Sequence, residues 1–147
     1  MGRNISFILL LFLCSFPFSL TNFLPFFKDL PPDPRHMMTS LLAGLLVLIT
    51  GLVMGLNDQR FFLRWYSGYW LTGLVLLLLG LITKAFVLFI PIAFLYVSPF
   101  YGLHDWLNIS SQQTLLFALP LAAWMIGMVG YGAGILFQAK KQPGAES

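Results

Sequence analysis

The sequence is short of charge. Asp, Glu, Lys and Arg make up 9% of its 147 residues, whereas 59% are apolar. Soluble domains carry roughly 25% charged residues, which they need in order to cover their surface. One domain is the usual content of a chain of this length. The composition therefore predicts a single integral membrane domain, residues 1–147, whose first partner is the lipid bilayer.

Patterns that carry chemistry are also scarce. The single cysteine, Cys14, excludes an intramolecular disulfide and a metal site built from thiols. Basic residues form no run longer than Lys140–Lys141, which is too short for a nucleic-acid-binding surface. The sequence has no HExxH pattern, GxSxG pattern or phosphate-binding glycine loop. We therefore expect no nucleic acid partner, no cofactor, no metal and no enzymatic activity.

Long apolar runs are abundant, and they predict an all-α bundle of four transmembrane helices. A run of about 20 apolar residues spans the ~30 Å hydrocarbon layer. The first run could be a signal peptide or a retained signal-anchor, and the lack of an A-x-A-like cleavage site favours the anchor. The stretch Lys28–His36 has three prolines and predicts a stiff polar connector. The expected helices cover about 5–24, 37–56, 66–83 and 114–137, followed by a polar tail, 138–147.

The third run does not end cleanly, because Lys84 is followed by another apolar stretch, 85–97, which contains Pro91. A single helix over 66–97 would be roughly 48 Å long, too long for one straight crossing. We therefore expect a short broken or interfacial helix after the third span. Lys84 is expected to reach the interface with its long side chain, and a buried functional lysine is the alternative.

Aromatic residues cluster at the beginning of the third run, at Trp65, Tyr66, Tyr69 and Trp70. Tyr and Trp are enriched where the bilayer meets water, because one end of each ring is apolar and the other polar. This cluster is therefore expected to anchor the helix at the level of the lipid headgroups.

Small residues recur at helical spacing in three of the runs. Membrane helices associate through close packing, and glycine lets two backbones approach each other. Gly51 and Gly55 form a GxxxG motif, a pattern typical of packed helix pairs. The residues expected to pack helices are Gly44, Gly51, Gly55, Gly73, Gly80, Ala123, Gly127, Gly130 and Gly134.

Basic residues are unequally divided between the two sides of a four-helix arrangement. One side receives Arg3, Arg60, Arg64, Lys140 and Lys141, and the other receives Lys28, Arg35 and, depending on its depth, Lys84. Cytoplasmic loops of membrane proteins carry the excess of Lys and Arg. Both termini are therefore expected in the cytoplasm, with the protein in an inner or plasma membrane.

The sequence has many patterns typical of helix packing and few typical of catalysis or metal binding. We therefore expect a non-catalytic subunit or scaffold of a membrane complex. Its glycine stripes would pack its own bundle and dock other membrane subunits, and a homo-oligomer is compatible with this. One alternative is an oligomeric channel or small transporter lined by Lys84 and the segment around Pro91. Another is an interfacial membrane enzyme that uses His104 and Asp105. The candidate functional polar residues are Lys84, His36, His104 and Asp105.

Overall fold

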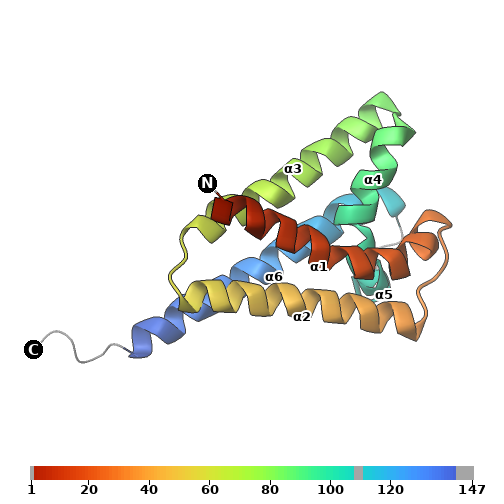
Figure 1. Cartoon of the computed structure of the whole chain (residues 1–147). Helices are drawn as coiled ribbons and strands as arrows, with labels where there is room; N and C mark the ends of the chain where they lie inside the picture. The colour runs from red at the N-terminus through yellow and green to blue at the C-terminus, as the bar shows by residue number, and fades with distance from the viewer. Residues whose placement is uncertain (1, 108–110, 142–147) are drawn as a thin grey trace, which may run out of the picture.

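Helices make up nearly all of the chain that the structure describes. The computed structural model covers residues 2–107 and 111–141, with side chains described for 15–104, 106–107, 111 and 113–140. These ranges contain no strand. In chain order the elements are α1 (Gly2–Phe27), α2 (Pro34–Leu56), α3 (Phe61–Thr83), α4 (Phe86–Tyr96), the 3₁₀ helix η1 (Ser98–Leu103), α5 (His104–Leu107) and α6 (Gln112–Lys141) (Figure 1).

Within the part of the chain whose side chains the structure describes, three helices have the length and apolarity needed to cross a bilayer. They are α2 and α3 over their full lengths, and α6 over Gln113–Lys140. The apolar helix α4 is shorter, with 11 residues. The expected all-α class is confirmed, and the three long apolar helices indicate a membrane protein.

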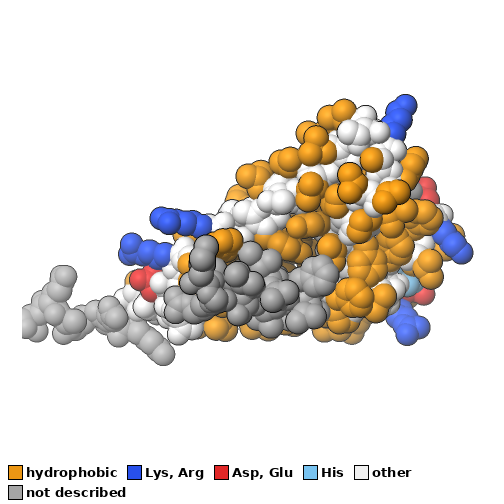
Figure 2. Space-filling view, turned by 45° about the horizontal axis from the view of Figure 1, so that its top comes forward, with side chains coloured by type: hydrophobic (Ala, Val, Ile, Leu, Met, Phe, Trp, Pro, Cys, Tyr) orange, Lys and Arg blue, Asp and Glu red, His pale blue; other side chains and the backbone are white. Residues whose placement is uncertain are grey.

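The helices define two ends of the molecule. The distal end holds the α1–α2 connection, the α3–α4 turn and α5, whereas the terminal end holds the α2–α3 turn and the end of α6 (Figure 1). Lys and Arg side chains lie at these two ends, and hydrophobic side chains occupy the surface between them (Figure 2). This division is the one that a bilayer imposes on a spanning bundle.

The closest helix pair is α2 with α6, which run parallel to each other. A Cβ added to Gly51 would overlap the carbonyl oxygen of Gly127, and one added to Gly55 would overlap that of Tyr131. From the other side, a Cβ on Gly130 would overlap the carbonyl oxygen of Leu48. Backbone therefore meets backbone along this seam, an approach that only residues without a side chain allow.

After α3 the chain turns sharply at Lys84, whose backbone is left-handed with φ 53°. Helix α4 then packs back against α3, with Phe89 beside Gly80 and Tyr96 over Gly73. From Tyr96 the chain continues into η1, which returns to the distal ends of α1 and α2. Residues 86–103 thus enter and leave the bundle at the same end, and we call them the re-entrant segment. The expected broken helix after the third span exists and folds back on that span.

Several helix boundaries differ from those expected. Helix α2 begins at Pro34, inside the expected connector, because Asp33 caps it and proline suits the first helical position. Helix α3 begins at Phe61 and α6 reaches Lys141, so part of each expected polar flank is helical. Polar residues in the last turns of a membrane helix can remain helical in water, since their backbone groups bond within the helix.

Two residues of the aromatic cluster of α3, Tyr66 and Trp70, lie in the core of the molecule rather than on its outer surface. Tyr66 and Trp70 are 1% and 3% exposed, while Trp65 is 39% exposed. The ring of Tyr66 lies between Phe62 and Trp70, and its hydroxyl donates a 2.7 Å hydrogen bond to the carbonyl oxygen of Ala123. Two helix backbones that diverge leave room for large rings, and α3 diverges from α2 toward the distal end (Figure 1).

Candidate functional site

A buried polar node joins three elements at the distal end. It consists of Asn22 on α1 with His36 and Ser40 on α2, and it holds the backbone of η1. Asn22 and Ser40 are both fully buried. Buried polar groups are tolerated when they are hydrogen-bonded to one another, as these are.

The hydrogen bonds of the node determine the orientation of the Asn22 amide and which ring nitrogen of His36 carries a hydrogen. The Asn22 amide nitrogen donates to Ser40 Oγ at 2.9 Å and to the Pro99 carbonyl oxygen at 3.4 Å. Its Oδ1 therefore faces His36 Nδ1, 3.0 Å away, and Nδ1 must carry the hydrogen. Ser40 Oγ also accepts a 2.9 Å hydrogen bond from the Gly102 amide. The node thus ties η1 to both α1 and α2.

Gly102 is needed where η1 crosses the start of α2. A Cβ at this position would overlap the carbonyl oxygen of His36. Beside it, the Tyr101 hydroxyl donates a 2.9 Å hydrogen bond to the carbonyl oxygen of Leu30. Backbone contact and side-chain bonds together fasten the re-entrant segment to the α1–α2 connection.

The candidate polar residues occupy separate positions at the distal end. His36 belongs to the node, and its Nε2 lies 3.6 Å from the Asp33 carboxylate. His104 follows η1, and its ring stacks on Tyr101 with centroids 5.5 Å apart. Lys84 is exposed at the α3–α4 turn. The side chains of Asp105 and Cys14 lie outside those described.

Asp33 makes the start of α2 sensitive to acid. Its carboxylate accepts a 2.9 Å hydrogen bond from the His36 amide, which, with the charge of the His36 ring, lowers the pKa of Asp33 below 3.8. A group with a lowered folded pKa stabilises the fold above its unfolded pKa and loses this contribution as the pH falls through the folded value. We expect the hydrogen-exchange protection of the His36 amide to fall below about pH 3.8. Asp33→Asn should abolish this pH dependence, because an amide caps a helix without titrating. Equal pH profiles for the two proteins would contradict the prediction.

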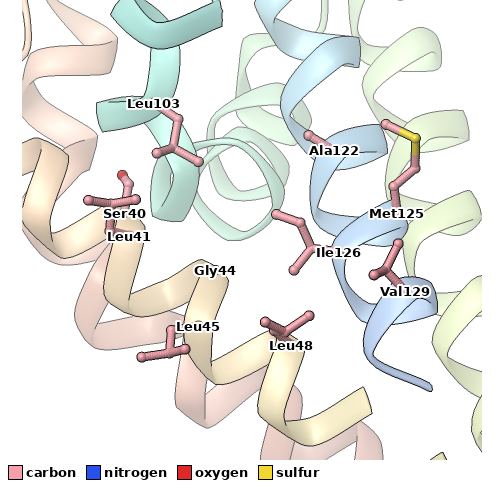
Figure 3. A pocket seen from close by; sticks show the side chains of 10 residues that line it. All are labelled: Ser40, Leu41, Gly44, Leu45, Leu48, Leu103, Ala122, Met125, Ile126 and Val129. Atoms are coloured by element: carbon pink, nitrogen blue, oxygen red, sulfur yellow. The ribbon is translucent and has the colours of Figure 1, made fainter. Parts of the chain in front are cut away.

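A wide apolar groove separates α2 from α6 on the distal side of their seam (Figure 3). The two helices diverge there, and the groove has a volume of about 490 Å³. Its lining comes from α2, α6 and η1, and the side chains of Leu48 and Ile126 project into it (Figure 3). The lining residues, which define the α2–α6 groove, are Ser40, Leu41, Gly44, Leu45, Leu48, Leu103, Ala122, Met125, Ile126 and Val129.

Gly44 differs from the other small residues of α2. Gly51 and Gly55 are covered by the α6 backbone, whereas a Cβ on Gly44 would meet one atom within 4 Å, the Ile126 Cδ1 at 3.8 Å. The other glycines expected to pack helices are covered by other parts of the bundle. Gly73 and Gly80 contact α4. Gly127 contacts Tyr66, and Gly130 and Gly134 contact α2. Ala123 is fully buried. Gly44 alone of this set therefore borders the open groove.

Sequence reasoning missed Asn22 and Ser40. Thr39 and Thr50 bond to their own helix, whereas Ser40 accepts hydrogen bonds from Asn22 and Gly102. One signal was available for Asn22, which is an amide side chain inside an apolar helix. Such a residue usually needs a partner on a neighbouring helix.

The fold defines the class as an all-helical bundle, with three membrane-type helices among the described residues. Within the part of the chain that the structure describes, no three His, Cys, Asp or Glu side chains are placed to hold a metal ion. Comparisons with protein-family models, curated proteins and solved structures find no match.

Proposed function

We propose that the protein is a non-catalytic subunit or scaffold of a membrane complex, and that it holds an apolar helix of a partner subunit in the α2–α6 groove. The observation that carries this proposal is the groove itself, an opening of about 490 Å³ in the lipid-facing surface. Leu45 and Val129 on its rim are 50% and 65% exposed. A partner would complete the packing that α2 and α6 begin at their seam.

Gly44 favours a helix as the occupant. Lipid tails are as apolar as leucine, so an apolar wall gives no preference between lipid and protein. A helix gains instead from close contact, which small residues permit. At the floor of the groove Gly44 leaves the α2 backbone open to such an approach. The groove also lacks a polar group that would orient a headgroup, since its Ser40 side chain is fully buried.

In this proposal α1 is a retained fourth span. Asn22 is bonded to Ser40 and His36 of α2, and Phe23 packs its ring on Phe94 of α4. If a leader ending near residue 20 were cleaved, Asn22 and Phe23 would lose most of the helix that positions them. The end of α6 and the Arg60 turn share the terminal end, where the basic excess favours a cytoplasmic location of both termini.

Two neighbouring leucines on α2 provide the test of partner docking. Leu45 lines the groove, whereas Leu46, 37% exposed, does not. Leu45→Trp is expected to fill the groove and reduce the recovery of foreign subunits about tenfold, equivalent to ~1.4 kcal/mol of binding. Leu46→Trp should leave recovery unchanged. Recovery is measured by mass spectrometry of the tagged protein purified in gentle detergent from its native membranes.

Other outcomes would overturn the proposal. Equal effects of the two substitutions would show that the partner does not contact the groove. Purification of the protein as a monomer without foreign subunits would contradict the scaffold proposal. A homo-oligomer that Leu45→Trp dissociates would show that a second copy fills the groove, and it would redirect the function toward an oligomeric channel.

A further inference from the structure

The tip of the α3–α4 hairpin combines an isolated cation with exposed apolar side chains. Lys84 lies in the turn, and the next helix begins with Phe86, Val87 and Leu88. These three side chains are 71%, 86% and 60% exposed. The tip projects away from the α2–α6 pair (Figure 1), so its apolar residues face the surroundings of the bundle.

Lys84 also borders a small apolar cavity. The cavity has a volume of about 140 Å³ and is lined by Gly80, Leu81, Lys84, Phe86 and Phe89. Gly80 keeps it open, because the α3 surface has no side chain at this point while Phe89 forms the opposite wall. A lysine ammonium group beside an apolar cavity suits an amphiphilic ligand, which has an anionic headgroup for the one and an apolar tail for the other.

No described side chain balances the charge of Lys84. At the same end of the bundle, Lys28 adjoins Asp29, and Arg35 lies close to Asp33 in sequence. The acidic residues nearest to Lys84 in sequence are Asp58 and Asp105. Among the described side chains, none forms an ion pair with Lys84, since the two pairs found involve His36 and Arg60. Its ammonium group is therefore available to an external anion.

We propose that the α3–α4 tip binds an anionic phospholipid. The lipid phosphate pairs with the Lys84 ammonium group, and an acyl chain lies along Gly80, Leu81 and Phe89. The distal end of α3 is the end of an apolar helix long enough to span the bilayer, so Lys84 is at the depth of headgroups. Basic residues near a membrane surface attract anionic lipid, and the exposed side chains of Phe86–Leu88 lie beside the acyl chains next to it.

Native mass spectrometry of the full-length protein released from mixed phosphatidylcholine and phosphatidylglycerol bilayers tests this site. The wild type should retain phosphatidylglycerol in preference to phosphatidylcholine. Lys84→Gln is expected to reduce this preference about fivefold, the effect of one basic residue at a membrane surface. Lys84→Arg should preserve it, and Lys28→Gln is the matched control from the same end. Circular dichroism establishes that each variant remains helical.

Each contrary result identifies another cause. Equal losses for Lys84→Gln and Lys28→Gln would show a diffuse electrostatic effect and overturn the site. Unchanged retention in Lys84→Gln would overturn it as well. Soluble glycerol phosphate that competes as well as the intact lipid would show an anion site without a role for the cavity. Because these measurements involve no partner subunit, their failure leaves the α2–α6 groove proposal unaffected.

Discussion

Gly51→Ala is expected to destabilise the bundle by about 3 kcal/mol or more, the upper range for overpacking a core. The added Cβ would overlap the Gly127 carbonyl oxygen and lie 3.0 Å from the Tyr131 nitrogen. Both of these are backbone atoms, so no rotamer change relieves the clash and α2 must move away from α6. Such a movement breaks the neighbouring contacts of Gly55 and Gly130 as well. Unfolding in increasing dodecyl sulfate, followed by circular dichroism, measures the loss.

The chain contains its own control for this substitution. Gly132 lies on α6 between Gly130 and Gly134, and a Cβ there would meet nothing within 4 Å. Gly132→Ala should therefore unfold at the wild-type detergent concentration. Similar midpoints for Gly51→Ala and Gly132→Ala would show that the α2–α6 seam does not hold the bundle together.

Local sequence signals were sufficient to predict the helices whose formation depends only on a long apolar run. Apolar runs matched to the bilayer thickness predicted α2, α3 and α6, because lipid leaves a spanning backbone few choices besides a helix. The return of α4 was not predictable in the same way. It depends on a left-handed Lys84, and no glycine or asparagine marks that turn in the sequence.

The burial of Tyr66 and Trp70 shows what a compositional rule leaves open. Tyr66 and Trp70 lie near a basic loop in sequence, as aromatic residues at a membrane interface do. Their helix, however, turns these two residues toward α6, where Tyr66 bonds to Ala123, 57 residues away. Which face of a helix is buried depends on its partners, and α3 has apolar residues on all sides. The sequence therefore could not distinguish its core from its lipid face.

The polar node was beyond prediction for a related reason. Its bonds join residues 18, 62 and 77 positions apart. An amide inside an apolar helix indicates that Asn22 needs a partner, but no local pattern says which one. Two of the partners in the node, the Pro99 carbonyl and the Gly102 amide, are backbone groups of a kind that most residues offer. The glycine stripes indicated close contact but not the partner helix, and only the structure separates the covered Gly51 from the open Gly44.

Asn22→Ala is expected to have the largest effect of any polar substitution, a loss of about 2–6 kcal/mol. It removes the bonds to Ser40, Pro99 and His36 together. A buried polar group left without its partner costs ~1–3 kcal/mol, so two such groups account for this range. The loss should be concentrated in η1, which the node ties to α1 and α2. Hydrogen exchange followed by mass spectrometry should show faster exchange in residues 98–103 than in the α2–α6 seam.

Ser19→Ala separates the node from a general effect of polar groups in α1. Ser19 is also fully buried, but its hydroxyl bonds to the Ser15 carbonyl oxygen within the same helix. Removing the Ser19 hydroxyl leaves no polar group of another helix without its partner. The expected loss of stability is below ~1 kcal/mol, the net value of a single hydrogen bond. If Asn22→Ala were no more damaging than Ser19→Ala, the bonds of Asn22 would not be what fastens the re-entrant segment to the bundle. The hydrogen bond from the Gly102 amide to Ser40 and the packing of Gly102 and Tyr101 would then hold η1.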